Sequence, residues 1–379
     1  MRIGIDCRYI LDVKYGELAG VGHYTYFLIK YLIQLDKENQ YFLFFYNKKI
    51  KCEEFEKNDN VKCVYFPGLE NIGKIPFLYR HIIIPHILSL YKLDIYHNPA
   101  NIIPFFYFKK SIITIHDLAL YKNPDWFPEG QKFSKYILTP FSIYKAKKII
   151  AVSENTKTDL IEMFKVNKDK IEVIYEGVED YNKFEIKETE IKEKFKFKQP
   201  YFLYIGTLEP RKNLVRLISA FAQFLQENKG SKYLLLLAGK KGWKDEPIFE
   251  KIKELKLEDK VIYLGYVSLK EKVYLLKNAY AFTFPSLYEG FGLPILEAVN
   301  LGLPIITSNI ASIPELIIDN ALLVDPYDVT SIKKALAKIV KDQKLRNELS
   351  HKGKGIAKHF TWQEAAKRTL ALYKGIARQ

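Results

Sequence analysis

The sequence is poor in cysteine, with three residues among 379. Cys7, Cys52 and Cys63 form no Cys-x-x-Cys pair, which argues against a disulfide framework and against a zinc site. We therefore expect a cytoplasmic protein with no bound metal.

Long apolar runs are also missing. The most apolar stretches, residues 82–90 and 102–108, are interrupted by Pro85 and His86 or end at Lys109, well short of the roughly 18 residues of a membrane-spanning helix. At the N-terminus, Asp6 interrupts the apolar run before a secretory signal could form. We expect neither a membrane span nor a signal peptide.

Acidic residues are outnumbered, and the formal net charge is +15, most of it in residues 181–379. A basic surface attracts nucleic acid, anionic lipid or phosphorylated small molecules, and charge alone does not choose among them. The sequence has no RNA-recognition, helix-turn-helix or zinc-finger motif. Nucleic acid is therefore not an expected partner.

Both halves of the chain alternate between short β-branched or aromatic segments and segments with helical periodicity. The predicted strands are residues 2–6, 41–46, 61–66, 95–97, 112–115, 149–152, 171–174, 201–204, 233–238, 261–264, 281–284, 304–307 and 321–324. Strands that alternate with helices predict parallel sheets with crossover helices. At 379 residues, the chain is long enough for two such domains.

The domain boundary is predicted from composition. Residues 179–200 are rich in lysine and glutamate without clean periodicity, which is typical of a surface connector. The capping box from Thr361 to Glu364 predicts the start of a last helix. We expect an acceptor-side domain at residues 1–180, a linker at 181–200, a nucleotide-sugar-binding domain at 201–360 and a C-terminal helix at 361–379.

Two glycines precede the helix predicted over residues 23–35. Gly20 and Gly22 lie between a strand and that helix, where a ligand can approach the helix N-terminus. Thr25 stands at the third glycine position of the dinucleotide fingerprint, and the loop after Asp6 is too long for its tight turn. The loop fits a plain turn as well as a ligand-binding loop.

Two adjacent cations stand at the start of a helix in the second half. Arg211 and Lys212 follow the strand that ends before Gly206, and an apolar helical face begins at Leu214. Cations at the positive end of a helix dipole are unfavourable by about 0.3–1 kcal/mol unless an anion is bound. We expect a phosphate here, with two solvated loop charges as the alternative. Both side chains are expected to lie in a loop and not in the core, so their removal should barely change the stability of the fold.

The strongest single signal is the stretch from residue 285 to residue 297. Glu289 and Glu297 are eight positions apart, and Gly290 and Gly292 follow the first glutamate. Glycines can expose backbone N–H groups to a phosphate at the start of the helix predicted over residues 293–299. Each carboxylate can accept sugar hydroxyl protons. Without an anion nearby, Glu289 would be only a helix-start residue.

Together these motifs resemble family 4 of the retaining glycosyltransferases with the GT-B fold, and the resemblance covers nearly the whole chain. The segments that carry it are Gly20-x-Gly22, Thr114-Ile115-His116-Asp117, Val152-Ser153-Glu154, Gly206-x-x-x-Pro210-Arg211-Lys212-Asn213, Glu289-x7-Glu297 and Ala311-Ser312-Ile313-Pro314-Glu315. The resemblance implies two Rossmann-like α/β domains with parallel sheets, facing across a cleft. The C-terminal domain would hold the nucleotide and the N-terminal domain would present the acceptor.

The resemblance also implies site residues. Arg211 and Lys212 would bind the donor diphosphate, Glu289 would touch the donor sugar, and His116 would approach it from the other domain. His116 read alone fits a strand-end histidine better. Glu297 would hold the ribose, and backbone beyond the strand that ends near Gly265 would contact the base. The implied nucleotide-sugar-binding residues are Gly20, Gly22, Gly206, Tyr266, Val267, Phe291, Gly292, Leu293 and Glu297.

Two segments depart from the commoner pattern of the family. Residues 176–179 read Glu-Gly-Val-Glu where relatives often show Asn-Gly-Val-Asp, and Asp319-Asn320 replaces a frequent Gly-Asp. Neither segment lies at the expected diphosphate site. The expected reaction class is unchanged, whereas details of the hinge and rim stay open.

The resemblance predicts a retaining hexosyltransferase in cell-surface polysaccharide or glycolipid synthesis, without a cofactor. The sequence has no Asp-x-Asp, the usual cue for a metal-bound diphosphate, so we expect metal independence. The sequence of residues 286–294 is similar to that of mannosyltransferases that use GDP-mannose. A UDP-sugar stays open as an alternative donor. The expected acceptor is a glycan or a lipid-linked molecule.

Aromatic and basic residues mix over residues 105–110 and 132–148, which is compatible with peripheral contact at an anionic membrane, such as the inner face of the plasma membrane. Core aromatics with solvated lysines are the alternative. The rival functions are a GT-B-fold phosphorylase, a nucleotide-sugar epimerase and a non-catalytic nucleotide-sugar binder. A nicotinamide dehydrogenase is disfavoured by Thr25 and by the long loop before Gly20.

Overall fold

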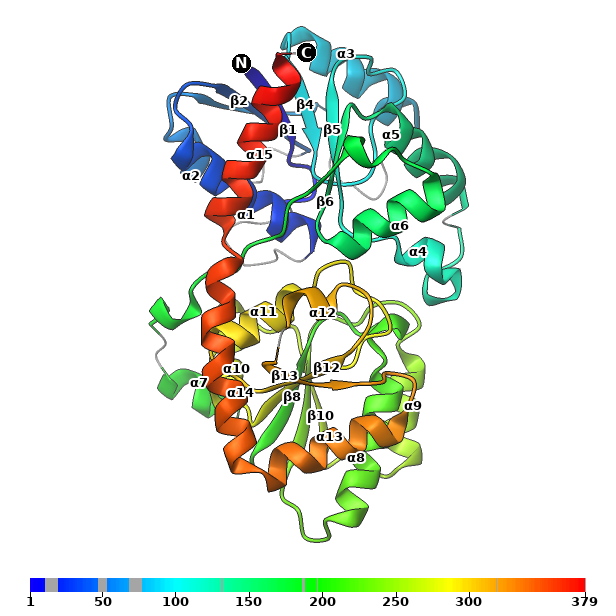
Figure 1. The fold of residues 1–379 in the computed structure, drawn as a ribbon, viewed down its shortest axis with the longest axis vertical. Coiled ribbons are helices and arrows are strands. Elements are labelled where there is room, and N and C mark those ends of the chain that lie inside the picture. The colour runs from blue at the N-terminus through cyan, green and yellow to red at the C-terminus, as the bar shows by residue number, and fades with distance from the viewer. Residues whose placement is uncertain are drawn as a thin grey trace. The chain divides into compact units, whose positions relative to one another are not determined.

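The computed structural model describes residues 1–10, 20–46, 53–67, 77–130, 132–185, 188–195, 197–317 and 319–378. The chain divides into two compact units, shown as a ribbon in Figure 1. The first comprises Met1–Leu118, Gly130–Gly177 and Thr361–Gln379, and the second comprises Ala119–Glu129 and Val178–Phe360.

The first unit is built on a seven-stranded parallel sheet in the order β3-β2-β1-β4-β5-β6-β7. Its strands are β1 (Arg2–Asp6), β2 (Gln40–Phe45), β3 (Val61–Tyr65), β4 (Ile95–Asn98), β5 (Ser111–Ile115), β6 (Lys148–Ala151) and β7 (Ile171–Val173). Its helices are α1 (Val21–Leu35), α2 (Glu53–Glu56), α3 (Ile84–Leu90), α5 (Thr139–Lys145), α6 (Glu154–Phe164) and α15 (Trp362–Ala377), with the shorter turns Tyr79–Ile83, Ser134–Leu138 and Lys168–Lys170.

The second unit is built on a six-stranded parallel sheet in the order β10-β9-β8-β11-β12-β13. Its strands are β8 (Tyr201–Ile205), β9 (Leu234–Ala238), β10 (Val261–Gly265), β11 (Ala281–Phe284), β12 (Ile305–Ser308) and β13 (Ala321–Val324). Its helices are α4 (Ala119–Lys122), α7 (Glu188–Lys194), α8 (Leu214–Glu227), α9 (Glu246–Glu254), α10 (Leu269–Asn278), α11 (Leu293–Asn300), α12 (Ile313–Leu316), α13 (Val329–Lys341) and α14 (Gln343–Ile356), with the shorter turns Pro124–Trp126, Tyr181–Lys183, Pro210–Lys212 and Ala357–His359.

All thirteen predicted strands are confirmed, and their ends differ from the predicted ends by at most one residue. The central strands β5, β8 and β9 are buried at every position, as expected for parallel strands covered on both faces. The two expected α/β domains with parallel sheets are therefore confirmed. Among the described residues, no helix is long and apolar enough to cross a membrane.

The two units differ from the expected domain ranges at residues 119–129, at residues 178–200, which belong to the second unit, and at the C-terminal helix. Residues 119–129 join the second unit, where the ring of Phe127 stacks on Trp243 with centroids 5.7 Å apart. The C-terminal helix α15 joins the first unit, where Trp362 stacks on Phe27 at 5.6 Å. Contacts between residues far apart in sequence decide both placements, and local composition does not report such contacts.

Each sheet has one point where the strand order reverses, between β1 and β4 in the first unit and between β8 and β11 in the second. In open parallel sheets, ligands bind outside the carboxyl ends of the strands at such a point. The loops after these four strands are therefore the places to look for function.

Candidate functional site

The loops after β8 and β11 carry the two strongest sequence motifs of the second unit. The turn Pro210–Lys212 follows β8 and leads into α8, and Glu289 lies in the loop between β11 and α11. The two loops are joined by the Leu287 backbone N–H, which donates to the Arg211 carbonyl at 2.8 Å. The reversal of strand order thus brings together motifs that are far apart in the sequence.

Arg211, Lys212 and Glu289 meet in a charged cluster that also contains Glu209. The Lys212 Nζ lies 2.6 Å from Glu289 Oε1, and Arg211 Nη1 lies 3.2 Å from Glu289 Oε2. Arg211 Nε lies 2.7 Å from Glu209 Oε1. Two side-chain carboxylates thus already offset the two cations, and the expected bound phosphate stays a prediction.

Burial makes this charged cluster unusual. Lys212, Glu209 and Glu289 are all buried, and Lys212 is only 7% exposed. The expectation that Lys212 lies outside the packed interior is therefore wrong. Burial alone would raise the pKa of Glu289, but Lys212 and Arg211 outweigh that effect and hold the pKa below its ordinary value. Glu289 is an ionised carboxylate at neutral pH.

The loop around Glu289 is held by the start of the neighbouring helix α12. The Ser312 hydroxyl lies 2.9 Å from both the Glu289 and the Phe291 carbonyl oxygens. Gly292 has φ of +115°, a conformation that favours glycine, and α11 begins at Leu293 directly after it. The predicted glycine-rich helix start is confirmed, although Phe291 itself is buried at 4% exposure.

Glu297 lies on α11, within the same unit as the charged cluster, but it is held by different partners. The Lys272 Nζ donates to Glu297 Oε1 at 2.5 Å, and the Tyr181 hydroxyl donates to the same oxygen at 2.7 Å. Neither Lys272 nor Tyr181 was expected at the site, and no local sequence signal marks them. A ribose bound to Glu297 would have to share that carboxylate with these two donors.

The other predicted donor-binding residues of the second unit lie at the carboxyl ends of strands. Gly206 follows β8 directly, and its N–H donates to the Ala238 carbonyl at 3.0 Å. Tyr266 and Val267 follow β10, with Tyr266 at 41% exposure and Val267 buried. The Lys240 Nζ lies 5.0 Å from the Tyr266 ring centroid. The accessible Tyr266 ring is the part of this edge best suited to stack on a base.

His116 follows β5 in the first unit, and both of its ring nitrogens have acceptors. Nδ1 lies 2.9 Å from Glu176 Oε1, and Nε2 lies 2.8 Å from the Pro99 carbonyl oxygen. A carbonyl can only accept a hydrogen bond, and an ionised carboxylate can only accept one as well. Nε2 therefore carries a proton, and protonation of Nδ1 as well lets His116 donate to Glu176.

Charges around His116 favour that protonated form. Burial alone would lower the pKa of His116, but the hydrogen bond and the charge of Glu176, with smaller contributions from Pro99 and Asp117, raise it above its ordinary value. Glu176 lies in the segment that departs from the common family pattern. That departure was the one sequence signal that could have found this residue.

Gly20 and Gly22 open α1, beside the point of reversal in the first sheet. Gly20 has φ of +53° and ψ of −123°, a combination that glycine alone adopts readily. A Cβ on Gly22 would lie 2.5 Å from the Tyr9 carbonyl oxygen. Both glycines are thus explained by backbone geometry, and their proposed contact with a nucleotide sugar stays a prediction.

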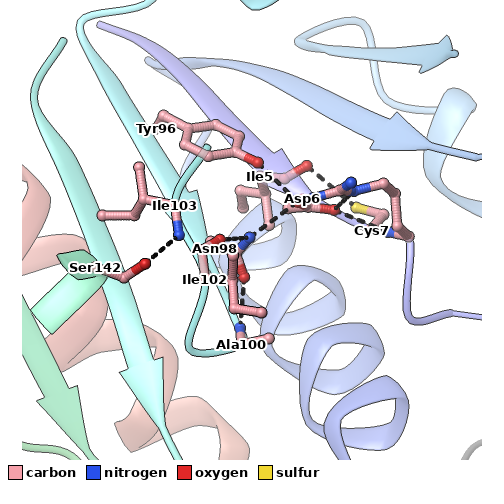
Figure 2. Close-up of polar contacts among 10 residues, drawn as sticks. Ile5, Asp6, Cys7, Tyr96, Asn98, Ala100, Ile102, Ile103 and Ser142 are labelled. Carbon is pink, nitrogen blue, oxygen red and sulfur yellow. Dashed lines mark hydrogen bonds and ion pairs between the residues drawn. The ribbon is translucent and has the colours of Figure 1, made fainter. Parts of the chain in front are cut away.

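A second polar cluster occupies the reversal point between β1 and β4. Asp6 is fully buried and pairs with Arg8, whose Nη2 lies 2.6 Å from Asp6 Oδ2. Figure 2 shows Tyr96 and Asn98 pointing toward the same carboxylate, with donor distances of 2.7 and 3.0 Å. Asn98 also accepts from the Ala100 N–H at 2.8 Å. This network fixes the ends of β1 and β4.

Replacing Glu176 with glutamine should lower the pKa of His116 below its ordinary value of about 6.5. The substitution removes the negative charge that opposes burial, and the groups left around His116 are Pro99, Asp117, His97 and Tyr24. In the wild type, the stability that this pair contributes is fully present below the pKa of His116 in the unfolded protein. It is lost as pH rises through the higher pKa of His116 in the folded protein.

An NMR pH titration of the ring protons would measure the change, with His116→Gln used for assignment and Glu162→Gln as the control. Glu162 is an exposed residue of α6. An unchanged His116 titration in Glu176→Gln would contradict the buried ion pair.

Comparisons with known proteins bear on this arrangement. The family described as Glycosyltransferase Family 4 matches residues 18–180, and the family described as Glycosyl transferases group 1 matches residues 185–355. "O-antigen chain mannosyltransferase B" of Escherichia coli is 31% identical over 375 residues, which cover 96% of this chain and 97% of that protein. "O-antigen chain mannosyltransferase RfbU" of Salmonella typhimurium is 31% identical over 231 residues, 61% of each chain.

Solved structures also resemble this chain. A sucrose-phosphate synthase from Thermosynechococcus elongatus aligns with a TM-score of 0.78 at 19% identity and covers 99% of this chain and 98% of its own. WaaG, a glycosyltransferase involved in lipopolysaccharide biosynthesis, aligns with a TM-score of 0.76 at 15% identity, over 98% of this chain and all of its own. At these identities the likeness concerns the fold, and the expected GT-B fold is confirmed.

Proposed function

The chain belongs to glycosyltransferase family 4, and we propose that it is a retaining, metal-independent hexosyltransferase that uses a nucleotide diphosphate sugar. Glycosyl transfer in polysaccharide synthesis is the function of the chain at the level of its family. The observation that carries the finer proposal is the charged cluster of Arg211, Lys212, Glu209 and Glu289 at the strand reversal of the second sheet.

In this mechanism the cations of the cluster act on the leaving group. The bond between the anomeric carbon and the phosphate oxygen breaks, and negative charge grows on the departing diphosphate. Arg211 offers a planar fork of donors, and Lys212 offers a compact charge. The diphosphate would compete with Glu209 and Glu289 for these donors, which frees Glu289 to accept hydroxyl protons from the sugar.

Retention is proposed to follow from transfer on one face of the sugar. The acceptor oxygen forms its bond to the anomeric carbon on the side from which the diphosphate leaves, and the acceptor proton passes to a phosphate oxygen. This scheme needs no protein nucleophile. When both ring nitrogens are protonated, His116 donates to Glu176 and Pro99, and in that form it supplies positive charge and does not act as a base.

We propose GDP-mannose as the favoured donor and a glycan or lipid-linked molecule as the acceptor. Relatives named as mannosyltransferases of O-antigen chains support both choices. A UDP-sugar is the alternative, since a structural neighbour, HepE of Anabaena, is described in complex with UDP-glucose.

A donor panel tests the function itself. GDP-mannose, UDP-glucose and other nucleotide sugars would be incubated with the protein and with candidate glycan acceptors, and nucleotide release and product mass would be measured. A transferase releases nucleotide together with a new glycoside. Thermal stabilisation by a donor without turnover would indicate a binder, interconversion of the donor without release would indicate an epimerase, and a strict need for phosphate would indicate a phosphorylase.

Turnover should persist in excess EDTA. The proposed site neutralises the leaving group with side chains, and within the described ranges no group of three His, Cys, Asp or Glu residues could hold a metal ion. Nucleotide release measured before and after chelation would check this expectation. A complete loss that added Mg²⁺ or Mn²⁺ restores would show that a metal shares the diphosphate.

We also propose a cytoplasmic location with peripheral contact at the inner face of the plasma membrane. The first unit exposes large apolar side chains in the relevant segments, each between 46% and 66% exposed: Phe77, Leu78, Phe106, Phe133, Tyr136 and Ile137. The ring centroid of Phe77 lies 5.8 Å from that of Phe133 and 6.0 Å from that of Phe105. Tyr107 and Leu138, expected at the same membrane contact, are buried.

Cosedimentation with anionic vesicles tests the membrane contact. We expect the protein to sediment with phosphatidylglycerol vesicles at low salt, and we expect Tyr136→Ser combined with Ile137→Ser to weaken binding several-fold, because two exposed apolar side chains are lost. Vesicles of phosphatidylcholine are the control. If the wild type does not bind anionic vesicles at low salt, the proposed membrane contact is wrong.

A further inference from the structure

A basic hollow of about 620 Å³ lies in the first unit, and part of its lining comes from the basic segments 105–110 and 132–148. Ser111 begins β5 and His116 follows its other end. At about 3.3 Å per residue, the two residues lie about 16 Å apart along the strand. The hollow is therefore at the amino edge of the sheet, opposite the edge that carries His116. Its lining residues are Phe108, Lys109, Lys110, Ser111, Lys145, Ala146, Lys147, Lys148, Asn167, Asp169 and Lys170.

Six lysines line the hollow with a single carboxylate, that of Asp169. Over the described parts of the chain, none of the six forms an ion pair. Four of the ammonium groups donate to backbone carbonyls instead: Lys110 to Ile376 at 3.2 Å, Lys145 to Phe105 at 2.5 Å, Lys170 to Tyr144 at 2.6 Å, and Lys148 to Asp169. Because an ammonium group has three protons, each of these keeps two for another acceptor.

Burial of the lysine ammonium groups without a counter-charge is energetically unfavourable. Lys145 and Lys170 are half-buried, and burial lowers the pKa of each below its ordinary value. Mutual repulsion among the six ammonium groups adds to that cost. An anion in the hollow would remove both penalties, whereas a neutral ligand would remove neither.

Ser111 supplies an independent observation. Ser111 is 2% exposed, and its hydroxyl oxygen Oγ has no hydrogen-bond partner among the described residues. A buried hydroxyl without a partner is unfavourable, so such groups are normally bonded to protein, water or ligand. Ser111 lines the hollow together with the lysines. The hollow thus offers a hydroxyl group in addition to positive charge.

We propose that this basic hollow binds a phosphate group that carries two negative charges. Ammonium groups from three separate segments and the Ser111 hydroxyl suit a compact anion with several acceptor oxygens, and the volume lies in the range of small-molecule sites. The phosphate is either free in solution or the exposed phosphomonoester of a lipid headgroup. The assignment goes beyond the transferase reaction and does not depend on it.

Titration calorimetry of the full chain with inorganic phosphate at low ionic strength tests the soluble source. Lys148→Gln combined with Lys170→Gln removes one charge from each of two segments, and we expect binding at least about tenfold weaker. Ser111→Ala should weaken binding a few-fold. Lys57→Gln combined with Lys92→Gln removes the same charge from exposed positions elsewhere in the unit and should leave binding unchanged. Arg211→Ala should leave it unchanged as well, which separates this site from the donor site.

Vesicles test the lipid source. Phosphatidic acid presents a phosphomonoester, and phosphatidylglycerol vesicles of matched surface charge do not. If only phosphatidic acid vesicles distinguish the wild type from the Lys148/Lys170 variant, the proposal holds with a lipid-borne phosphate. If the control lysine variant loses as much binding, or if neither probe separates the Lys148/Lys170 variant from the wild type, the proposal is overturned.

Discussion

Arg211→Ala is expected to lower kcat/KM by roughly ten- to a hundredfold or more. The guanidinium reaches Glu289 and the loop that carries it, and it is proposed to donate to charge that grows on the leaving diphosphate. A charge-assisted hydrogen bond contributes about 1.5–3 kcal/mol, and about 1.36 kcal/mol corresponds to a tenfold change in rate. Steady-state kinetics with the donor identified in the panel would measure the change.

Lys212→Ala should lower kcat/KM by a similar factor, but the structure changes how that result must be read. Lys212 is buried against Glu289, and removal of one partner from a buried ion pair costs roughly 3–5 kcal/mol of stability. Removal of Arg211 keeps the Lys212–Glu289 pair, but it takes away the ion-pair partner of the buried Glu209, which lies 2.7 Å from Arg211 Nε. Both variants therefore need a stability measurement beside the kinetics.

Lys253→Ala provides the matched control, since it removes one exposed positive charge from α9 in the same unit. Thermal unfolding of each variant would separate loss of activity from loss of structure. If Arg211→Ala and Lys212→Ala both stay folded and leave kcat/KM unchanged in a verified transferase assay, the diphosphate is held elsewhere.

Strands were predictable because their signal is local. A buried parallel strand is a short run of β-branched and aromatic residues between turns, and β8 and β11 show that run within a window of five residues. The position of Arg211 and Lys212 at the carboxyl end of β8 followed from the same local pattern. Their proximity to Glu289 needed the strand order, which places β11 directly beside β8.

The partners of the site residues were not predictable from local patterns. Glu297 is bonded by Lys272 from α10 and by Tyr181 from a segment expected to be a linker. Glu176 meets His116 across 60 positions, because β5, β6 and β7 are adjacent and their following loops converge. Each pairing depends on tertiary packing, so composition and periodicity are silent about it. The departure at Glu176 marked a position but not its partner.

Asp6→Asn is expected to lower the free energy of unfolding of the first unit by about 3–5 kcal/mol, the cost of breaking a buried ion pair from one side. Arg8 is 5% exposed and would lose its charged partner, and the bonds from Tyr96 and Asn98 would meet a weaker acceptor. Figure 2 shows Tyr96 and Asn98 converging on one carboxylate at the ends of β1 and β4.

The measurement can be confined to the first unit. Of the three tryptophans in the sequence, Trp362 belongs to that unit, whereas Trp126 and Trp243 belong to the second. With Trp126→Phe and Trp243→Phe in the background, fluorescence during urea unfolding reports on the buried Trp362 alone. Asp259→Asn is the control, because it makes the same chemical change at an exposed position of the second unit.

The effect should also depend on pH in a defined direction. Burial alone would raise the pKa of Asp6, but Arg8 and the hydrogen bonds to the carboxylate lower it below its ordinary value. Because the pKa of Asp6 is lower in the folded protein, its ionisation contributes stability above the unfolded pKa of about 3.9. This stability is lost as pH falls through the folded pKa of Asp6. The difference between wild type and Asp6→Asn should be constant near neutrality and shrink in acid. Asp6→Leu combined with Arg8→Met should recover only part of the loss, because it removes the unpaired Arg8 charge but leaves Tyr96 and Asn98 without their carboxylate acceptor. A difference below about 1 kcal/mol at pH 7 would mean that Arg8 finds another counter-charge and that the pair does not fix the β1 and β4 ends.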